Sequence, residues 1–350
     1  MQLNKRFYIN SLDGIRAVAA MMVFISHAGL PNLVPGGFGV TIFFFLSGYL
    51  VTTLLRNEYE KSGAINLKKF YLRRIYRIFP PMYLVLCLIA TSVFVGVLKS
   101  DMHLNAVLAQ VFHLTNYYVI VFGSKNLVPD TVSYWSLAIE EHFYLLFPLL
   151  FLFFIRRWSY KGIAKLLFSM CLAVLVWRVV LVYELNASQQ RTYMATDTRF
   201  DSLLFGCIMG VWANPIFSSD YKPFRERYIK IITLMCAIGL LIFTFIFRDE
   251  FFRETIRYTL QGVALFPIFW LAVDCHDWLI FRWLNWKPVS LFGMVSYVFY
   301  LSHLYWLHVG NILLKGIKAG FLGFGLALIF SVLVYWLVEY PFSKLRRVLH

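Results

Sequence analysis

The sequence predicts an all-α polytopic membrane protein, a bundle of about ten transmembrane helices with both termini in the cytoplasm. Hydrophobic residues make up 60% of the 350 residues and charged residues only 15%, whereas a soluble domain has about 25% charged residues. The hydrophobic residues form long continuous runs and not the alternating pattern of a transmembrane β-barrel. Lysine and arginine are concentrated in alternate loops. These three observations together predict the fold class.

The apolar stretches account for most of the chain, and each is close to the ~20 residues that a spanning helix needs. They lie near residues 12–30, 38–56, 79–99, 134–155, 164–184, 199–215, 229–247, 256–274, 291–313 and 320–339. Because they leave little room between them, we expect one transmembrane domain over residues 1–350.

The distribution of cations predicts the orientation of the helices. With the N-terminus inside, the inside segments hold the cation clusters of 5–6, 56–77, 156–165, 222–230, 282–287 and 344–347, and the opposite loops hold scattered cations. This positive-inside bias places both termini in the cytoplasm. Together with attraction to anionic membrane lipids, it accounts for the net charge of +15 without a nucleic-acid partner.

The first apolar stretch carries ionisable residues that a simple membrane anchor would not tolerate: Asp13, Arg16 and His27. On an α-helix, Arg16 and His27 fall within roughly 20° of one face and about 16 Å apart along the axis. Such residues inside a bilayer usually face a cavity or the bundle interior and mark a site. The alternative is that Arg16 extends to the interface and His27 caps the far end of the helix.

The second and third stretches carry small and basic residues. Ser47 and Gly48 permit close approach of a neighbouring backbone, so plain helix packing also explains them. Arg74 and Arg77 lead into the third stretch and share a helix face, which gives a fork suited to phosphate oxygens. An ordinary cytoplasmic cluster that binds lipid headgroups is the alternative.

Two adjacent carboxylates open the fourth stretch. Glu140 and Glu141 follow Trp135 and enter an apolar helix, where carboxylates need partners or protonation. Glu140 and Tyr144 are spaced to face one cavity. An interfacial aromatic belt would explain Trp135 and Tyr144 but not the two glutamates.

Polar residues also open the sixth stretch and occupy the ninth. Arg199 and Asp201 can pair with each other or with residues on neighbouring helices, either as a structural ion pair or within a site. In the ninth stretch Tyr297 precedes His303, which lies in the middle of the helix. A hydrogen-bonded core histidine is the alternative to a functional one.

The sequence contains no motif for metal or nucleotide chemistry. Its histidines, cysteines and carboxylates show no zinc-like spacing, so we expect no metal site. A phosphate-binding loop of the GxxxxGK[ST] type and a GxSxG nucleophile elbow are also absent from the sequence.

Six polar motifs and a closing element occur in one order along residues 11–342. They are Arg16-x10-His27, Phe44-Phe45-Leu46-Ser47-Gly48, Arg74-x-x-Arg77, Trp135-Ser-Leu-x-x-Glu140, Arg199-x-Asp201, Ser296-Tyr297 with His303, and Glu339-x-Pro341. In this order they closely resemble the membrane-bound acyltransferase-3 family, whose members O-acylate bacterial surface sugars, such as O-antigen and exopolysaccharide, and some small molecules. Each motif alone is weak, but their order is specific.

The resemblance implies an enzyme that takes an acyl group, usually acetyl, from cytoplasmic acyl-CoA and passes it to an acceptor outside. It implies that His27 is the catalytic histidine and that Arg16, Arg74 and Arg77 serve the acyl-CoA end, with Ser47 beside them. Acetyl-CoA would be a cosubstrate and no cofactor would be permanently bound.

The resemblance also implies a bacterial inner (plasma) membrane location and a sugar or glycolipid acceptor, such as a surface polysaccharide or lipid-linked sugar. We expect no appended soluble esterase-like domain of the kind that some relatives carry. The remaining candidates for acceptor binding or structural support are Asp13, Trp135, Glu141, Tyr144, Arg199, Asp201, Tyr297 and His303.

Physical chemistry fits this hypothesis. The CoA phosphates cannot enter a bilayer core without a large desolvation cost, and the roughly 16 Å from Arg16 to His27 suits a long thin pantetheine arm. Neutral His27 would take a proton from an acceptor hydroxyl as that oxygen attacks the thioester. Glu140 would orient the imidazole or bind acceptor hydroxyls. An acyl-histidine intermediate is the competing chemistry.

Three other classes of function remain open. A transporter or flippase of a lipid-linked sugar would also place charges near the midplane, although the two halves of the chain show no internal repeat. An O-acyltransferase acting on a macrolide or a lipid would share the same core. A receptor or scaffold that binds headgroups would not require His27 and Glu140 inside the membrane.

Overall fold

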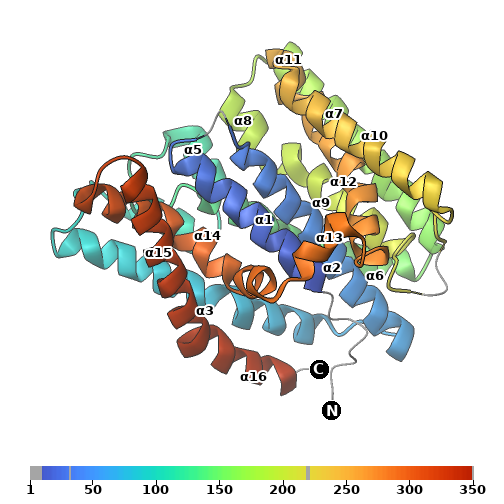
Figure 1. Cartoon of the computed structure of the whole chain (residues 1–350), viewed down its shortest axis with the longest axis horizontal. Helices are drawn as coiled ribbons and strands as arrows, with labels where there is room; N and C mark the ends of the chain where they lie inside the picture. The colour runs from blue at the N-terminus through green and yellow to red at the C-terminus, as the bar shows by residue number, and fades with distance from the viewer. Residues whose placement is uncertain (1–9, 31–32, 218–220, 349–350) are drawn as a thin grey trace. The chain divides into compact units, whose positions relative to one another are not determined.

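The computed structural model describes residues 10–30, 33–217 and 221–348, and every regular element in these ranges is a helix. The chain forms two compact units. Of the described residues, the first unit comprises 10–19, 37–65, 146–217 and 221–293, and the second comprises 20–30, 33–36, 66–145 and 294–348. Figure 1 follows the chain through its helices. The predicted all-α class is confirmed over the described residues.

Each of the ten predicted stretches overlaps a helix. These helices are α1 (Asn10–His27), α2 (Gly36–Ser62), α3 (Leu67–Phe94), α6 (Tyr134–Ile155), α7 (Tyr160–Tyr183), α9 (Thr196–Val211), α10 (Arg227–Ile246), α12 (Ile256–Asp274), α14 (Lys287–Leu313) and α15 (Ile317–Val334).

Short helices that the apolar pattern does not predict lie between the long ones. They are α4 (Leu104–Val111), α5 (Thr115–Phe122), α8 (Gln189–Met194), α11 (Glu250–Glu254), α13 (Leu279–Arg282), a 3-10 turn at Trp283–Asn285 and, after the last long helix, α16 (Tyr340–Val348). They are too short to give a hydrophobic run of membrane-spanning length. A π-helical turn at Tyr335–Glu339 continues α15 within the predicted stretch 320–339.

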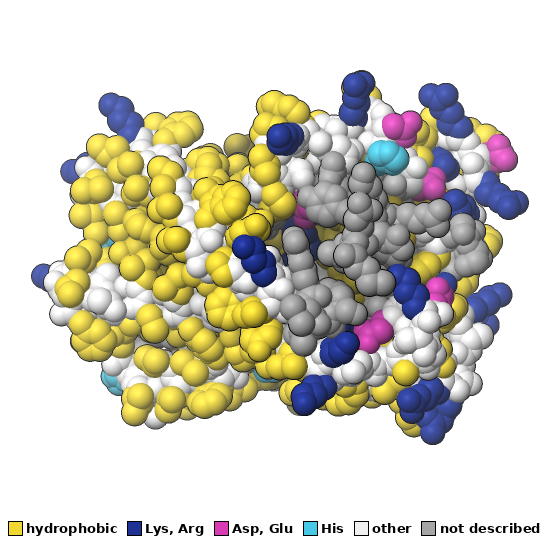
Figure 2. Space-filling model, turned by 90° about the horizontal axis from the view of Figure 1, so that it is seen from below, with side chains coloured by type: hydrophobic (Ala, Val, Ile, Leu, Met, Phe, Trp, Pro, Cys, Tyr) yellow, Lys and Arg dark blue, Asp and Glu magenta, His cyan; other side chains and the backbone are white. Residues whose placement is uncertain are grey.

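Seven helical segments among the described residues are long and apolar enough to cross a membrane: α2, α3, α6, α7, α10, α12 and the continuous segment 317–346. By contrast, α9 has 16 residues, fewer than the ~20 of a typical span. Large hydrophobic side chains are exposed along α7 and α10, as expected of surfaces that meet lipid. Figure 2 shows broad hydrophobic areas on one face of the molecule.

The third long helix begins earlier than its apolar run. The side chain of Asn66 accepts a hydrogen bond from the backbone N–H of Lys69 at 3.0 Å, and so caps the N-terminus of α3. The helix then continues through Pro80 and Pro81, although proline usually disfavours a helix interior. Arg74 and Arg77 therefore lie within α3 and not in a segment that precedes it.

In the first unit, α9 packs against α7 and α12, and α10 packs against α12 (Figure 1). Glycines bring α9 close to α2. A Cβ atom on Gly48 would lie 2.0 Å from the carbonyl oxygen of Leu203, and one on Gly206 would lie 1.9 Å from the carbonyl oxygen of Phe45. The Ser47-Gly48 motif thus permits close backbone contact in this unit.

We expect Gly48→Ala to destabilise the protein by about 1–3 kcal/mol, because the added methyl group overpacks the α2–α9 contact. Gly239→Ala is the matched control, since Gly239 lies within α10 and a Cβ there would meet nothing within 4 Å. That control should be neutral or up to about 1 kcal/mol more stable, as alanine favours helix. Unfolding by SDS titration in mixed micelles measures both, and equal effects at the two sites would contradict the close contact.

In the second unit, α3 contacts several helices. The hydroxyl of Tyr297 on α14 donates to the carbonyl oxygen of Ile78 on α3 at 3.0 Å. The ring of Tyr76 on α3 lies 5.9 Å from that of Phe342 on α16. The first contact holds the part of α14 that carries the polar motif against α3, and the second holds α16 against α3.

An aromatic cluster joins the last turns of α1 to α14 and α15. The ring centroid of Phe24 lies 5.5 Å from that of Phe299 and 5.4 Å from that of Phe324. The Phe299 and Phe324 centroids are 5.6 Å apart. Ring pairs at these distances pack favourably, so the end of α1 is anchored beside α14.

Candidate functional site

Two histidines meet in the second unit. The Nδ1 atom of His27, the last residue of α1, lies 2.9 Å from the Nε2 atom of His303 on α14. The Nδ1 atom of His303 lies 2.6 Å from the carbonyl oxygen of Tyr300. His27 is exposed, whereas His303 is only 1% exposed. Phe24 and Phe299 pack one turn before these histidines on their respective helices, which explains why the imidazoles come together.

The hydroxyl of Tyr300 fixes α14 to the start of α6. It lies 2.6 Å from the Oγ atom of Ser136 and 3.2 Å from the carbonyl oxygen of Ser133. Trp135, between these serines, is 5% exposed. The Trp135-Ser-Leu motif therefore supports α14, the helix that carries His303.

The glutamates predicted at the start of α6 lie near the arginines of α3. Tyr144 donates a hydrogen bond to Oε2 of Glu140 at 2.6 Å, so these two side chains share a face. The guanidinium of Arg74 lies 4.7 Å from the centre of the Tyr144 ring, a cation–π distance. Arg77, Glu140 and Glu141 are electrostatic neighbours of Arg74. Within the described residues, the buried Oε1 of Glu141 forms no hydrogen bond.

Two residues near the chain's end join this cluster. Glu339 and Arg346 are both electrostatic neighbours of Arg77. Glu339 closes the π-helical turn, a feature that often occurs at functional sites. The sequence indicated Glu339 only through the Glu-x-Pro element, and Arg346 only as one cytoplasmic cation among several.

Two titratable groups lie in connecting segments of the second unit. Burial raises the pKa of Asp130, and its 2.9 Å hydrogen bond to Nδ1 of His308 opposes that shift. Burial, and to a smaller extent the neighbouring charge of His142, lower the pKa of His113 to about 4. The His113 imidazole is therefore neutral near pH 7.

The other predicted site residues belong to the first unit. Asp13 and Arg16 form an ion pair three residues apart on α1, and Asp13 is 5% exposed. Ser47 precedes the glycine of the α2–α9 contact. The structure thus gives the charge of Asp13 a partner, Arg16. A bound acyl-acceptor molecule is not needed to explain why Asp13 is buried.

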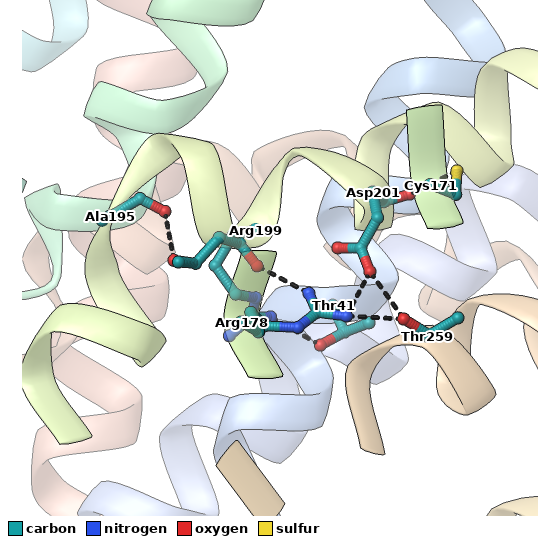
Figure 3. A network of polar contacts seen from close by, with 8 residues as sticks. Thr41, Cys171, Arg178, Ala195, Arg199, Asp201 and Thr259 are labelled. Atoms are coloured by element: carbon teal, nitrogen blue, oxygen red, sulfur yellow. Dashed lines mark hydrogen bonds and ion pairs between the residues drawn. The ribbon is translucent and has the colours of Figure 1, made fainter. Parts of the chain in front are cut away.

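Asp201 forms a buried ion pair in the first unit (Figure 3). Its Oδ2 atom accepts from the guanidinium of Arg178 on α7 at 2.7 Å and from the hydroxyl of Thr259 on α12 at 3.0 Å. The side chains of Arg178 and Asp201 are both 0% exposed. Of the two alternatives for Asp201, the structure shows a partner on a neighbouring helix.

Arg199 is held by different contacts. Its guanidinium donates to the hydroxyl of Thr41 at 2.9 Å and lies 4.1 Å from the centre of the Tyr258 ring. Arg178 was not predicted from the sequence as a site residue. The only indication of Arg178 in the sequence was its position as a lone arginine within the apolar stretch 164–184. None of the polar motifs included it.

Among the residues that the structure describes, no group of three or more histidine, cysteine, aspartate or glutamate side chains is arranged to hold a metal ion. The polar groups around the histidine pair are the two imidazoles and the backbone carbonyls of Tyr300, beside His303, and Val23, beside His27. Its geometry is that of a hydrogen-bonded chain.

Comparisons with known proteins agree with the order of the motifs. A family model described as an acyltransferase domain matches residues 9–340. The O-acetyltransferase OatA of Staphylococcus aureus strain NCTC 8325 is 32% identical over 312 residues, which cover 85% of this chain and 50% of that relative. The provisionally named O-acetyltransferase SACOL0978 of Staphylococcus aureus strain COL is 31% identical over 360 residues, which cover 97% of this chain and 58% of that relative.

The chain spans about half the length of these curated relatives. No solved structure matches it. The match to the family model covers both units and all six polar motifs. The chain therefore belongs to the acyltransferase-3 family and is a multi-pass membrane protein.

Proposed function

We propose that this protein is an O-acyltransferase that moves an acyl group, most simply acetyl, from acyl-CoA at the cytoplasmic face of a bacterial plasma membrane to an acceptor hydroxyl on the other side. The acceptor is a surface polysaccharide or a lipid-linked sugar. The family match over residues 9–340 and the names of the relatives support the reaction class. Three observations support about ten spans with both termini cytoplasmic: seven described segments of spanning length, three further helices over predicted apolar stretches, and the loop cations.

The observation that carries the proposal is the exposed imidazole of His27, whose Nδ1 atom already has a hydrogen-bonding partner. Its Nε2 atom takes the proton of the acceptor hydroxyl while the hydroxyl oxygen attacks the thioester carbonyl carbon. The new C–O bond forms, the C–S bond breaks, and the proton passes to the departing CoA sulfur. A positioned general base of this kind contributes about 10²–10⁴-fold in rate.

The arginines of α3, Arg74 and Arg77, are the proposed binding site of the CoA phosphates. Arg74 and Arg77 share an electrostatic neighbourhood, and guanidinium groups suit bidentate contact with phosphate. Glu140, Glu141 and Tyr144 lie beside Arg74 and therefore support the phosphate end of the site. The sugar is proposed to contact Trp135, whose flanking serines hold Tyr300 near the histidines.

We expect Arg77→Gln to weaken acetyl-CoA binding by about 10- to 100-fold, because a charge-assisted hydrogen bond contributes about 1.5–3 kcal/mol. Arg157→Gln is the matched control, since Arg157 is exposed, belongs to another predicted cytoplasmic cluster and contacts the ring of Phe153. Isothermal titration with acetyl-CoA measures both variants. Equal weakening in both would indicate general charge attraction and not a phosphate contact at Arg77.

Transfer from radiolabelled acetyl-CoA by the purified protein tests the proposal. The acceptor panel contains glycans, a lipid-linked sugar, a macrolide and a lipid. Labelling of a sugar supports the proposal, and labelling only of the macrolide or the lipid would correct the acceptor. Saturable binding without transfer would mean that the panel lacks the acceptor. If the protein neither bound acetyl-CoA nor transferred the acetyl group, the enzyme hypothesis would be contradicted and a transporter of a lipid-linked sugar would be favoured.

A further inference from the structure

The hydrogen bonds around His303 determine which nitrogen atoms carry protons. The carbonyl oxygen of Tyr300 only accepts, so Nδ1 of His303, 2.6 Å away, is the donor. A neutral imidazole carries one N–H, and the Nε2 atom of His303 is therefore an acceptor. Nδ1 of His27 lies 2.9 Å from that acceptor and must donate to it. Nε2 of neutral His27 is then left without a proton.

The charged alternative for His303 is unfavourable. A protonated His303 would carry an ion in a side chain that is 1% exposed, and a buried charge without a counter-ion has a large desolvation cost. Its contacts are the carbonyl of Tyr300, the His27 imidazole and the Tyr300 ring, which is 5.7 Å away. Two protonated imidazoles would also place two N–H donors against each other.

We propose that His303 is a positioning residue that holds His27 in the Nδ1–H tautomer. Nε2 of His27 then carries no proton and can take one from the hydroxyl group of the substrate that receives the acyl group. This inference rests on the proposed function of His27 as the general base. It assigns to His303 the orienting role that the sequence suggested for Glu140, whose Oε2 accepts from Tyr144.

The pair also supports the charge that forms during the reaction. When Nε2 of His27 takes the hydroxyl proton, the imidazole becomes a cation with an N–H at each nitrogen. Its Nδ1–H continues to donate to Nε2 of His303, which requires no further proton movement. The chain that ends at the Tyr300 carbonyl therefore stabilises the cation until the proton passes to the CoA sulfur.

Tyr300 links this chain to α6. Its backbone carbonyl accepts from His303, and its hydroxyl contacts Ser136 and Ser133. The orientation of His303 is therefore fixed from two helices, as a positioning residue requires. Ser133 and Ser136 bracket Trp135, which gives a physical reason for a Trp-Ser motif at the start of α6.

Three variants test the inference. His303→Leu removes the acceptor for His27 while filling much of the space, and we expect kcat to fall by about 10- to 10³-fold with KM for acetyl-CoA unchanged. His303→Gln offers an oxygen near the former Nε2 position and should recover part of that loss. His308→Leu is the control on the same helix, since His308 contacts Asp130, and its kcat should stay at the wild-type value.

These outcomes separate the inference from the proposed function. If His27→Ala is inactive but His303→Leu keeps the wild-type kcat, the positioning role is wrong and the general base stands. If His27→Ala keeps full activity, the proposed base itself is wrong. A fall in kcat with no recovery in His303→Gln would indicate a packing role for His303 and contradict the inference.

A direct measurement covers the case in which His303→Leu does not fold. Nitrogen NMR of wild-type protein labelled with ¹⁵N-histidine, assigned with His27→Gln, reports which nitrogen of His27 is protonated. We expect Nδ1 of His27 to be protonated and its Nε2 to be unprotonated at neutral pH. A proton on Nε2 in the folded wild-type protein would overturn the inference, whatever the activity of the variants.

Discussion

Replacing His27 with alanine is expected to lower acyl transfer by about 10²–10⁴-fold while leaving the affinity for acetyl-CoA unchanged. The physical reason is that the variant loses the group that takes the hydroxyl proton, whereas the arginines of α3 that are proposed to hold the phosphates are untouched. Single-turnover transfer and equilibrium binding of acetyl-CoA, measured on the same preparation, check both parts. A joint loss of binding and transfer would place His27 in substrate binding and not in the chemical step.

His308→Ala provides the matched control for this experiment. His308 belongs to the same unit, is exposed and forms a hydrogen bond to Asp130, but it lies outside the histidine chain. We expect transfer to continue at the wild-type rate. If the control and His27→Ala lost activity equally, the loss would reflect a disturbed structure.

Replacing Arg178 with methionine is expected to destabilise the protein by about 3–5 kcal/mol. The change keeps most of the side-chain volume but removes the partner of Asp201, whose carboxylate is 0% exposed. An uncompensated charge would remain buried among α7, α9 and α12. The free energy of unfolding in mixed micelles, measured by SDS titration, gives the loss directly.

An exposed pair on α8 and α9 serves as the control. Arg191 and Asp197 also form an ion pair, at 2.5 Å, but their side chains are 25% and 38% exposed. Arg191→Met should therefore cost only about 0–1 kcal/mol. The double variant Arg178→Met with Asp201→Leu should be more stable than Arg178→Met alone, because it leaves no orphaned charge. Equal losses at both pairs would contradict the account.

The sequence could predict the long helices because hydrophobic runs of spanning length are a strong local signal. It placed α6 and α12 at their observed bounds, 134–155 and 256–274. It began the third helix at residue 79, while the structure begins it at Leu67. The early turns of α3 are rich in basic residues, and their helix depends on the Asn66 cap and on packing, which an apolar run does not show.

The partners of the polar residues were harder to predict. His27 and His303 are 276 residues apart, and no local pattern indicates that they meet. The sequence identified Arg199 and Asp201 but not Arg178, because a single arginine in an apolar stretch carries no spacing signal. The i, i+4 pair of Glu140 and Tyr144 could be predicted, since helix geometry alone brings those two side chains together.

Transfer across a sealed membrane tests the central claim most directly. Proteoliposomes that enclose the acceptor and expose the cytoplasmic face of the protein receive radiolabelled acetyl-CoA from outside, in a single turnover. We expect label on the enclosed acceptor, dependent on His27, with none on the protein. Label that accumulates on the protein when the acceptor is left out would contradict direct transfer and indicate an acyl-histidine intermediate or another acyl-enzyme. If the protein bound the acetyl-CoA added outside the proteoliposomes but no enclosed acceptor became labelled, transfer across the membrane would be contradicted.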